Sequence, residues 1–370
     1  VLPESGRPGF TLLAPGSTRL QFTNRLDELA GAVNRTLYNG AGVAAGDVDG
    51  DGRPDLFFCD ISGNNALFRN LGNFTFENVT QTSGIRAPVP GCRGAVLADI
   101  DGDRDLDLLL AVTGGGVLSF INDGRGHFAE ATSGSGTSSS LGASTIAIAD
   151  VDGNGTPDLY VANYSTEDVR DRGRVNIQMI GGKPVLPGSR PDRFLLVDGK
   201  LVEAGQPDQL YLNEGAGRFR AVSLTDGTFL DESGNPLKAP PNDWGLTATF
   251  RDLNGDGAPD LYVCNDYWTP DRCWINDGKG RFRALPTMAM RKTPASSMGV
   301  DVADVDRDGD MDLFVVDMLS RYPHLRKRQG FAQAMMPAPM GVDPMRHQVM
   351  RNVLLLARGD GTYADVAFQA

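Results

Sequence analysis

A nine-residue acidic pattern occurs five times in this chain of 370 residues, and each copy runs directly into an apolar segment. Every copy reads D-x-[DN]-x-[DN]-x-x-x-D, which places oxygen-bearing side chains at positions 1, 3, 5 and 9. The copies begin 52, 51, 102 and 52 residues apart, and since 102 is twice 51, we expect one repeat to carry an insertion. A period of about 50 residues is typical of a chain built from copies of one supersecondary unit. The five copies are Asp47–Asp55, Asp99–Asp107, Asp150–Asp158, Asp252–Asp260 and Asp304–Asp312.

The side chains of this pattern favour a hard divalent cation. Carboxylate and amide oxygens, without Cys or His among them, suit Ca²⁺ or Mg²⁺ better than zinc or copper. Magnesium keeps several waters and rarely receives a cage made by protein alone, so we predict about five bound Ca²⁺ ions. Acidic turns without a metal would explain one such loop, but five in register favour calcium. The predicted ligands are the side chains at positions 1, 3, 5 and 9 and the backbone carbonyl at position 7: Asp47, Asp49, Asp51, Arg53, Asp55, Asp99, Asp101, Asp103, Asp105, Asp107, Asp150, Asp152, Asn154, Thr156, Asp158, Asp252, Asn254, Asp256, Ala258, Asp260, Asp304, Asp306, Asp308, Asp310 and Asp312.

These loops differ from an EF-hand, which requires a glutamate at position 12 and flanking helices. Position 12 is apolar in all five copies: Phe58, Leu110, Val161, Val263 and Val315. The residues that follow each loop are rich in β-branched and aromatic side chains, which favour strands. We therefore predict that each metal loop joins two β-strands. The second copy has Arg104 where the others have glycine, which argues against ideal turn geometry there.

A second repeated signature follows the acidic loops. Asn-x-Gly or Gly-x-Gly stands between apolar runs, as in Tyr211–Phe219 and Trp274–Phe282, and marks a tight hairpin. Each repeat therefore contains four antiparallel strands, and radial repetition of such units is typical of a β-propeller. We predict an all-β fold, with residues 1–370 forming a single β-propeller domain. Its five blades are expected at about 41–80, 93–132, 144–224, 245–285 and 298–367, with insertions at about 164–206 and 318–350.

The ends of this sequence do not complete the predicted ring. Residues 10–24 are expected to supply the last two strands of a partial blade, whereas the chain stops just after an outer strand. A propeller normally joins its first and last blades through strands from both termini. We expect six or seven blades in the complete ring, closed either by polypeptide beyond residue 370 or by another chain.

The residues resemble a known family at this point. The run Gly40–Gly52 followed by Asp55-Leu56 is similar to the calcium-loop propellers with FG-GAP or VCBS-type repeats, as in integrin α-subunit heads. The resemblance is closest to the secreted CRTAC/ASPIC-UnbV group and covers most of residues 20–370. It implies the fold and the calcium loops, but it implies little about activity because one fold hosts many functions.

Both insertions fall between the second and third strands of a blade, so we expect them on the rim opposite the calcium loops. Loops of this kind commonly carry binding functions. An aromatic rim there would suit a sugar or a peptide, although packing within the fold is the favoured interpretation. Methionines of the second insertion are expected to form an adaptable contact surface rather than a metal site. The candidate partner-binding residues are Tyr164, Trp244, Tyr267, Trp268, Met335 and Met336.

The four cysteines are expected to form two disulfides on the same rim, Cys59–Cys92 and Cys264–Cys273. Four buried thiols in a cytosolic protein remain the alternative, because spacing alone does not establish pairing. Calcium loops of modest affinity are filled where the free ion is abundant, which favours a secreted, extracellular or periplasmic home. No stretch approaches the roughly 20 apolar residues of a membrane span.

Composition argues against several classes of function. The net charge of −12 reflects mainly the metal loops, and a basic patch suited to nucleic acid is missing apart from residues 321–328, read as a solvated loop. Only three histidines occur, and no Cys-His or Ser-His constellation is evident. We therefore expect a non-catalytic, calcium-stabilised module for protein interaction or assembly. The alternative is a propeller that binds or degrades polysaccharide, with Asp266 or Asp317 as the acids on the insertion rim.

Overall fold

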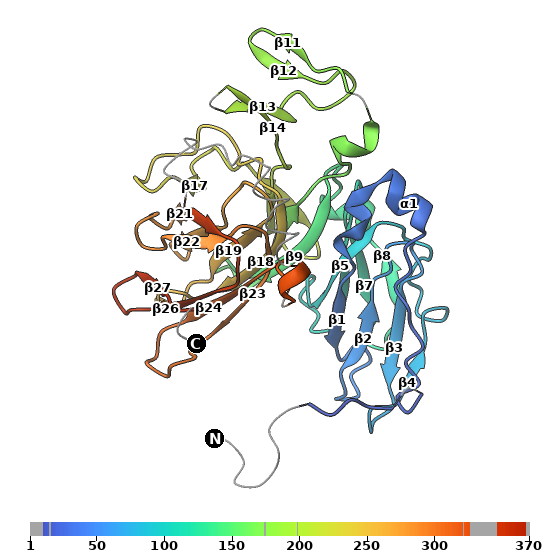
Figure 1. Cartoon of the computed structure of the whole chain (residues 1–370). Coiled ribbons are helices and arrows are strands. Elements are labelled where there is room, and N and C mark those ends of the chain that lie inside the picture. The colour runs from blue at the N-terminus through green and yellow to red at the C-terminus, as the bar shows by residue number, and fades with distance from the viewer. Residues whose placement is uncertain are drawn as a thin grey trace.

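The computed structural model describes residues 10–14, 16–173, 175–197, 199–320, 322–325 and 346–367. Five four-stranded antiparallel blades dominate it, and their inner strands pack side by side in chain order (Figure 1). The predicted all-β propeller fold is confirmed, while the number of blades in a complete ring stays a prediction. From inner to outer strand the blades are β1 (Val43–Gly46), β2 (Asp55–Phe58), β3 (Ala66–Asn70) and β4 (Phe76–Asn78); β5 (Cys92–Ala98), β6 (Asp107–Val112), β7 (Gly116–Asn122) and β8 (Phe128–Glu130); β9 (Ala143–Ala149), β10 (Asp158–Asn163), β15 (Gln209–Asn213) and β16 (Phe219–Val222); β18 (Gly245–Arg251), β19 (Asp260–Asn265), β20 (Arg272–Asn276) and β21 (Phe282–Ala284); and β23 (Ser297–Ala303), β24 (Asp312–Asp317), β26 (Val353–Ala357) and β27 (Tyr363–Asp365).

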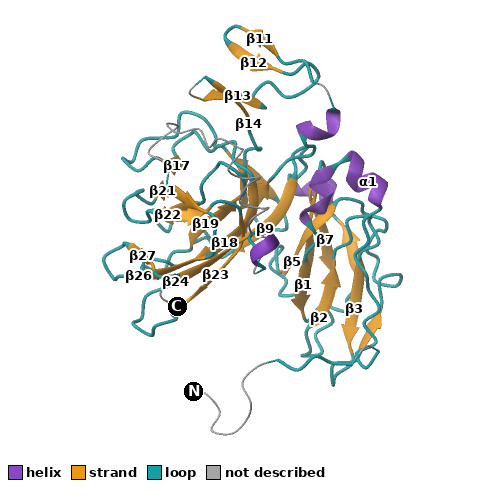
Figure 2. Ribbon diagram, in the orientation of Figure 1, coloured by secondary structure: helices purple, strands orange, loops and turns teal. Residues whose placement is uncertain are grey.

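Smaller elements decorate the blades (Figure 2). The insertion between β10 and β15 forms two hairpins, which stand away from the blades at the top of the view. One short strand, Phe229–Leu230, pairs in parallel with the edge strand of the fourth blade. Two others, Lys292–Pro294 and His347–Val349, pair in parallel with each other. Among the described residues no helix is both long and apolar enough to cross a membrane. These elements are α1 (Glu28–Val33), η1 (Arg35–Asn39), α2 (Thr132–Ser135), η2 (Val169–Arg172), β11 (Gln178–Ile180), β12 (Lys183–Val185), β13 (Phe194–Val197), β14 (Lys200–Glu203), β17 (Phe229–Leu230), β22 (Lys292–Pro294) and β25 (His347–Val349).

The acidic loops and the insertions lie at opposite ends of the blades. Each acidic loop joins the first strand of a blade to the second, whereas each insertion joins the second strand to the third. Since neighbouring strands are antiparallel, successive connections alternate between the two ends of the sheet. The insertion hairpins therefore mark the end of the molecule that is remote from the loops (Figure 1).

The hydrophobic core lies between consecutive blades rather than inside any one of them. Successive side chains of a strand point to opposite faces of its sheet, so the second strand of a blade can pack against the blade before it and the blade after it. In the second blade Leu108 packs against the first blade, and the next residue, Leu109, packs against the third. The same alternation holds for Leu159 and Tyr160 in the third blade. Four such interfaces join the five blades.

The last blade exposes the face that would receive a following blade. The third residue of the second strand is buried in the first four blades, where it is at most 4% exposed: Phe57, Leu109, Tyr160 and Tyr262. Its counterpart in the fifth blade, Phe314, is 42% exposed. Phe314 pairs across the sheet with Leu354, so both side chains belong to this face. The fifth blade thus carries an apolar face with no blade against it among the described residues.

The first blade is covered differently from the prediction. Residues 10–14 and 16–24 form no strand, although two strands were predicted for 10–24. Instead Leu20 and Phe22 pack on the first blade, where Phe22 stacks on Phe58 with ring centroids 4.9 Å apart. The segment attaches to the edge strand through one hydrogen bond, from the Phe76 N–H to the Thr18 carbonyl at 2.9 Å. Burial of apolar side chains holds this segment in place without a strand ladder.

Candidate metal centre in the acidic loops

Each acidic loop is organised by its first carboxylate, which accepts hydrogen bonds from the backbone of the loop it begins. In the first loop, Asp47 accepts from the Asp51 N–H at 3.1 Å and from the Gly52 N–H at 2.7 Å. Asp150, Asp252 and Asp304 make the corresponding contacts in their own loops. The carboxylate oxygens are thereby drawn over the loop, where they face the other acidic side chains.

Position 6 of each loop requires a left-handed backbone. The glycines there have φ between 83° and 100°, and Arg104 adopts the same conformation with φ of 77°. Glycine enters this region without steric cost, whereas an L side chain pays about 1–2 kcal/mol. The second loop therefore keeps the shared geometry, and the expected departure at Arg104 takes the form of local strain.

The ninth carboxylate has a role that the sequence pattern did not reveal. It is fully buried in every loop, and its two oxygens accept one N–H from loop position 2 and one N–H from the third strand. In the third blade the donors to Asp158 are Val151 at 2.9 Å and Asn213 at 2.8 Å. All ten bonds of this kind measure 2.7–3.0 Å. The ninth residue thus clamps the loop to the blade as well as offering a ligand oxygen.

Burial also changes the acidity of these carboxyls. Loss of solvent, together with the smaller effect of the neighbouring loop acids, raises the pKa of Asp107, Asp158 and Asp260 to about 6. The pKa of Asp55 is raised in the same way. A buried carboxylate beside several others is costly without a cation, so these sites are electrostatically suited to bind one.

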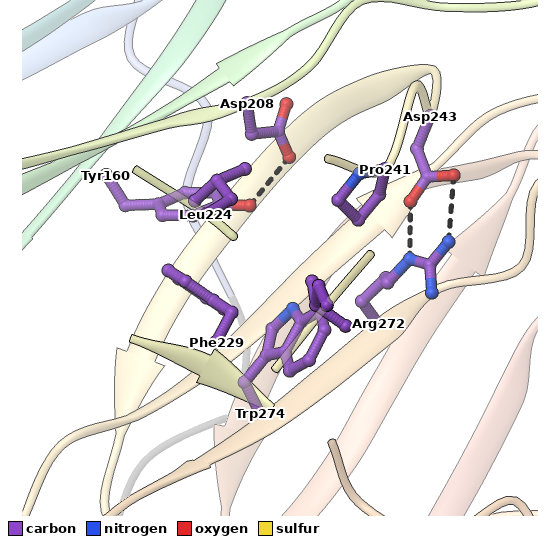
Figure 3. Close-up of a pocket in the computed structure, with 9 residues that line it drawn as sticks. Tyr160, Asp208, Leu224, Phe229, Pro241, Asp243, Arg272 and Trp274 are labelled. Atoms are coloured by element: carbon purple, nitrogen blue, oxygen red, sulfur yellow. Dashed lines mark hydrogen bonds and ion pairs between the residues drawn. The ribbon is translucent and has the colours of Figure 1, made fainter. Parts of the chain in front are cut away.

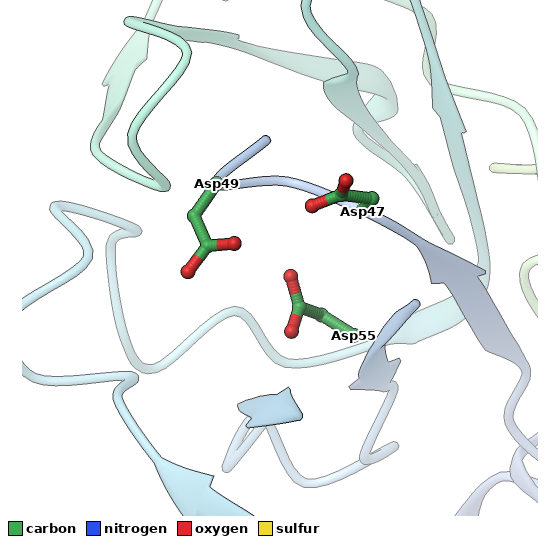
Figure 4. Close-up of side chains that lie close together, drawn as sticks. All are labelled: Asp47, Asp49 and Asp55. Atoms are coloured by element: carbon green, nitrogen blue, oxygen red, sulfur yellow. The ribbon is translucent and has the colours of Figure 1, made fainter. Parts of the chain in front are cut away.

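The loop acids converge on a point where a cation would fit. In the first three loops the oxygens of positions 1, 3 and 9 lie within 4.8 Å of one another, and Figure 4 shows Asp47, Asp49 and Asp55 in this arrangement. In the fifth loop positions 1, 3 and 5 converge instead. In the fourth loop Asn254 replaces the aspartate of position 3, and its amide donates to Asp256 at 2.9 Å. The donor set is made of oxygens alone, as Ca²⁺ prefers. The position 7 carbonyls stay a prediction.

One oxygen at the first loop has no partner in the fold. The Asp49 side chain is only 5% exposed, and its Oδ1 accepts no hydrogen bond from any described residue. A buried carboxylate oxygen without a donor is costly, and a bound cation would satisfy it.

The glycine hairpins of the second, third and fourth blades each attach to the loop of the blade before. The Asn122 amide donates to the carbonyl of Val48 at 2.8 Å, and Asn276 donates to Val151 at 2.9 Å. Asn213 makes the same contact with Ile100. The Asn-x-Gly signature, predicted to form only a turn, therefore also links consecutive blades.

The opposite rim contains a compact aromatic cluster formed by three of the predicted partner-binding residues. Tyr164, Trp244 and Tyr267 lie with ring centroids 5.0–6.3 Å apart. Tyr164 and Trp244 are buried, and the Trp268 indole donates to the Glu203 carbonyl at 2.9 Å. Packing of the insertion against the blades accounts for these contacts. Met335 and Met336 lie outside the described residues.

The rim acids are bound within the fold. Asp266 accepts the Tyr164 hydroxyl at 2.9 Å and the Tyr267 N–H at 2.7 Å. Asp317 accepts the N–H groups of Ala295 and Ser296 at 3.0 and 3.2 Å. Both carboxyls act as acceptors that cap backbone and side-chain donors around the second strands.

All four cysteines lie within the described residues and are buried thiols, so the two predicted disulfides are not formed in the structure. The sheet register pairs Cys273 with Tyr262, which leaves Cys264 as a diagonal neighbour. Diagonal Cα atoms lie about 7–8 Å apart, beyond the usual reach of a disulfide. Cys59 and Cys92 do lie together, and the hydrogen bond between their side chains raises the pKa of Cys92 well above its usual value.

Two further buried carboxyls, which the sequence reasoning missed, stand at the start of third strands. Asp208 accepts the Tyr160 hydroxyl at 2.8 Å beside the Asp243–Arg272 ion pair, in a cavity of about 10 Å³ between the third and fourth blades (Figure 3). Asp271 accepts from Tyr262 and Ser297 at 2.7 Å each. The Pro-Asp pair that precedes the third strand in both the third and the fourth blade was the available signal.

These buried carboxyls predict a pH dependence of stability. Burial raises the pKa of Asp271 to about 7, whereas the unfolded chain has the ordinary value near 3.8. The folded state therefore holds more protons between about pH 4 and 7, and its stability falls as the pH rises through that window. In this window the free energy of unfolding should fall less steeply with pH in Asp271→Asn than in wild type, by about 1.4 kcal/mol per pH unit. Urea unfolding at several pH values and constant calcium measures the difference. An unchanged slope would contradict the assignment.

Comparison with known proteins agrees with this architecture. A family model described as FG-GAP-like repeat matches residues 47–110, 99–161 and 252–315. Cartilage acidic protein 1 of Mus musculus is 24% identical over 294 residues, which cover 75% of this chain and 39% of that protein. The Homo sapiens protein is 25% identical over 296 residues, covering 75% and 38%. The chain spans about two fifths of the length of these curated relatives.

Among solved structures, a lectin of Agrocybe aegerita that recognises non-reducing terminal N-acetylglucosamine has 17% identity and a TM-score of 0.33. That alignment covers 86% of this chain and 77% of the lectin, and at this score it supports no functional argument. The three matches of the family model together contain all five acidic loops. The chain therefore contains FG-GAP-like repeats within a propeller fold and is similar to cartilage acidic protein 1 over three quarters of its length.

Proposed function

We propose that this chain is a non-catalytic propeller that calcium stabilises and that serves as a module for protein interaction or assembly outside the cytosol. The observation that carries the calcium part is the convergence of buried and half-buried carboxylates in repeated loops of one geometry. Each loop crowds like charges together, and a dication would remove that repulsion. In this proposal the ions are structural, since they lock turns at one end of the blades.

The uncovered face of the fifth blade supports an assembly role. Phe314 stands exposed at a register where the other blades bury their side chains against a neighbour. Exposed apolar surface of this kind is a common mark of an interaction site. A further blade, from the same protein or from another chain, would cover it and continue toward the predicted six or seven blades.

The acids on the insertion rim favour a non-catalytic role. Asp266 and Asp317 accept hydrogen bonds from the fold itself. A general acid or base needs its proton available to substrate. The polysaccharide alternative would rest on these acids and on the aromatic cluster, and the buried rings of that cluster present little surface to a sugar.

The location and the thiols belong to the same proposal. The relatives are named for cartilage, an extracellular tissue, and free calcium outside the cytosol is abundant enough to fill modest sites. In such an oxidising compartment the neighbouring thiols of Cys59 and Cys92 would form one disulfide.

Native mass spectrometry of the purified chain in calcium tests the proposal directly. We expect about five bound ions per chain, because five loops share one ligand pattern. The same spectrum reports how many chains associate. Spectra without bound calcium, at ion concentrations found outside cells, would contradict the proposal.

A further inference from the structure

The first acidic loop differs from the other four in the cations that surround it. Asp49 forms an ion pair with Arg69, and Asp51 forms an ion pair with Arg53. Arg69 reaches the loop from β3, whereas Arg53 occupies loop position 7. Two guanidinium groups thus lie on two of the acids that were predicted as calcium ligands.

The other blades carry no charge at the position of Arg69. The third-strand residue whose N–H binds the ninth carboxylate is Asn70 in the first blade, and Arg69 stands just before it. The residues just before the corresponding donors are Ile121, Leu212, Ile275 and Leu356. Position 7 of the other loops is likewise free of positive charge, with Asp105, Thr156, Ala258 and Asp310. Arg104 and Arg307 stand within the second and fifth loops, but neither forms an ion pair with a loop acid among the described residues. Ion pairs between arginine and the loop acids are therefore found in the first loop alone within the described part of the chain.

The geometry places Arg69 in competition with an ion. Its guanidinium binds Oδ2 of Asp49, while Oδ1 of the same carboxylate is buried and without a partner, beside Asp47 and Asp55 (Figure 4). A cation at the convergence point would use Asp49 and would repel a guanidinium held against it. A cleft of about 90 Å³, lined in part by Asp49, Arg69 and His127, gives the arginine side chain room to turn away.

We infer that Arg69 is a tethered competitor, which occupies Asp49 when calcium is absent and must leave it when calcium binds. This inference rests on the proposed calcium function and deepens it. The first loop then binds calcium more weakly than it would with the apolar residue found in the other blades. The first loop should therefore lose its calcium at ion concentrations where the loops without such an ion pair are still filled.

The size of the effect follows from the exposure of the pair. The Arg69 side chain is 44% exposed, so solvent screens its attraction to Asp49. Surface ion pairs of this type change equilibria by about twofold to fivefold, and partial burial of the Asp49 carboxylate extends the range to about tenfold. We expect Arg69→Leu to tighten one calcium site by about twofold to tenfold and to leave the others unchanged.

Calcium titration of the chelator-treated chain, followed by calorimetry and competition with a chromophoric chelator, measures this change. Leucine occupies the same position in the third and fifth blades, so the fold accepts it. Arg86→Leu is the matched control, because Arg86 is an exposed arginine paired with Glu130 at 3.4 Å and touches no loop acid. It should alter no site.

Asp49→Ala, alone and combined with Arg69→Leu, assigns the change to the first loop. Alanine is used because asparagine, which stands at this position in the fourth loop, would keep a ligand oxygen. Both Asp49→Ala variants should lack the weak site, and the double variant should gain nothing from the leucine. If Arg69→Leu leaves every site unchanged, or weakens one, the inference is wrong while the calcium function stands. If the wild-type chain binds no calcium at all, both fail.

Discussion

Removal of calcium is expected to lower the melting temperature of this chain by about 20 °C. An ion that binds only the folded state adds about 2.7 kcal/mol when its free concentration is a hundredfold above Kd. Five ions of this affinity would add more than about 10 kcal/mol, and a large domain changes its Tm by about 2 °C for each kcal/mol. The measurement is a thermal melt followed by circular dichroism, with and without a chelator.

Re-addition of single ions separates calcium from other causes. Excess Ca²⁺ should restore the original melt, whereas Mg²⁺ should restore less of it, since magnesium gives up its own waters reluctantly. Identical melts in chelator and in calcium would show that the acidic loops keep their shape without an ion. The calcium-stabilised propeller would then be wrong.

Loss of the ninth carboxylate is expected to destabilise the fold even when no calcium is present. Asp158→Ala leaves the N–H groups of Val151 and Asn213 buried without an acceptor. Each unsatisfied buried donor costs about 1–3 kcal/mol, so we expect a loss of about 2–6 kcal/mol. Urea unfolding in the presence of a chelator measures this loss free of any contribution from the metal.

The third position of the same loop supplies the matched control. Asp152 accepts only the Asn154 N–H, at 3.2 Å and on the exposed side of the loop. Asp152→Ala should therefore unfold like wild type in chelator but lose stability in calcium, because it removes a ligand and hardly any structure. Equal losses for the two variants in chelator would contradict the assigned clamp.

The repeat itself was readable from the sequence because its chemistry is local. A loop acid and the strand that follows it lie within nine residues, and hairpin glycines stand next to the turns they form. Blade architecture and candidate ligands follow from such short-range patterns. The five blades of the structure match that prediction, although the short strand β17 adds a fifth strand to the sheet of the fourth blade.

Other contacts join residues that are far apart in the chain. Asp208 meets the Tyr160 hydroxyl across 48 positions, and Asn122 reaches the carbonyl of Val48 across 74. The predicted bridge from Cys264 to Cys273 failed for a related reason, since sheet register decides which side chains face each other. Register depends on pairing along the whole strand, which residue spacing does not report.

The sequence by itself determined the repeating unit, its all-β class and the oxygen chemistry of the five loops, because each depends on residues close together in the chain. Only the tertiary structure decided what the loop acids do. It separated the earlier loop acids, whose oxygens converge where an ion would bind, from the buried ninth residues, whose oxygens accept backbone N–H groups. It also placed Arg69 against an acid of the first loop. Burial and charge pairing arise when strands from separate parts of the chain pack together, so neither could be read from the acidic pattern.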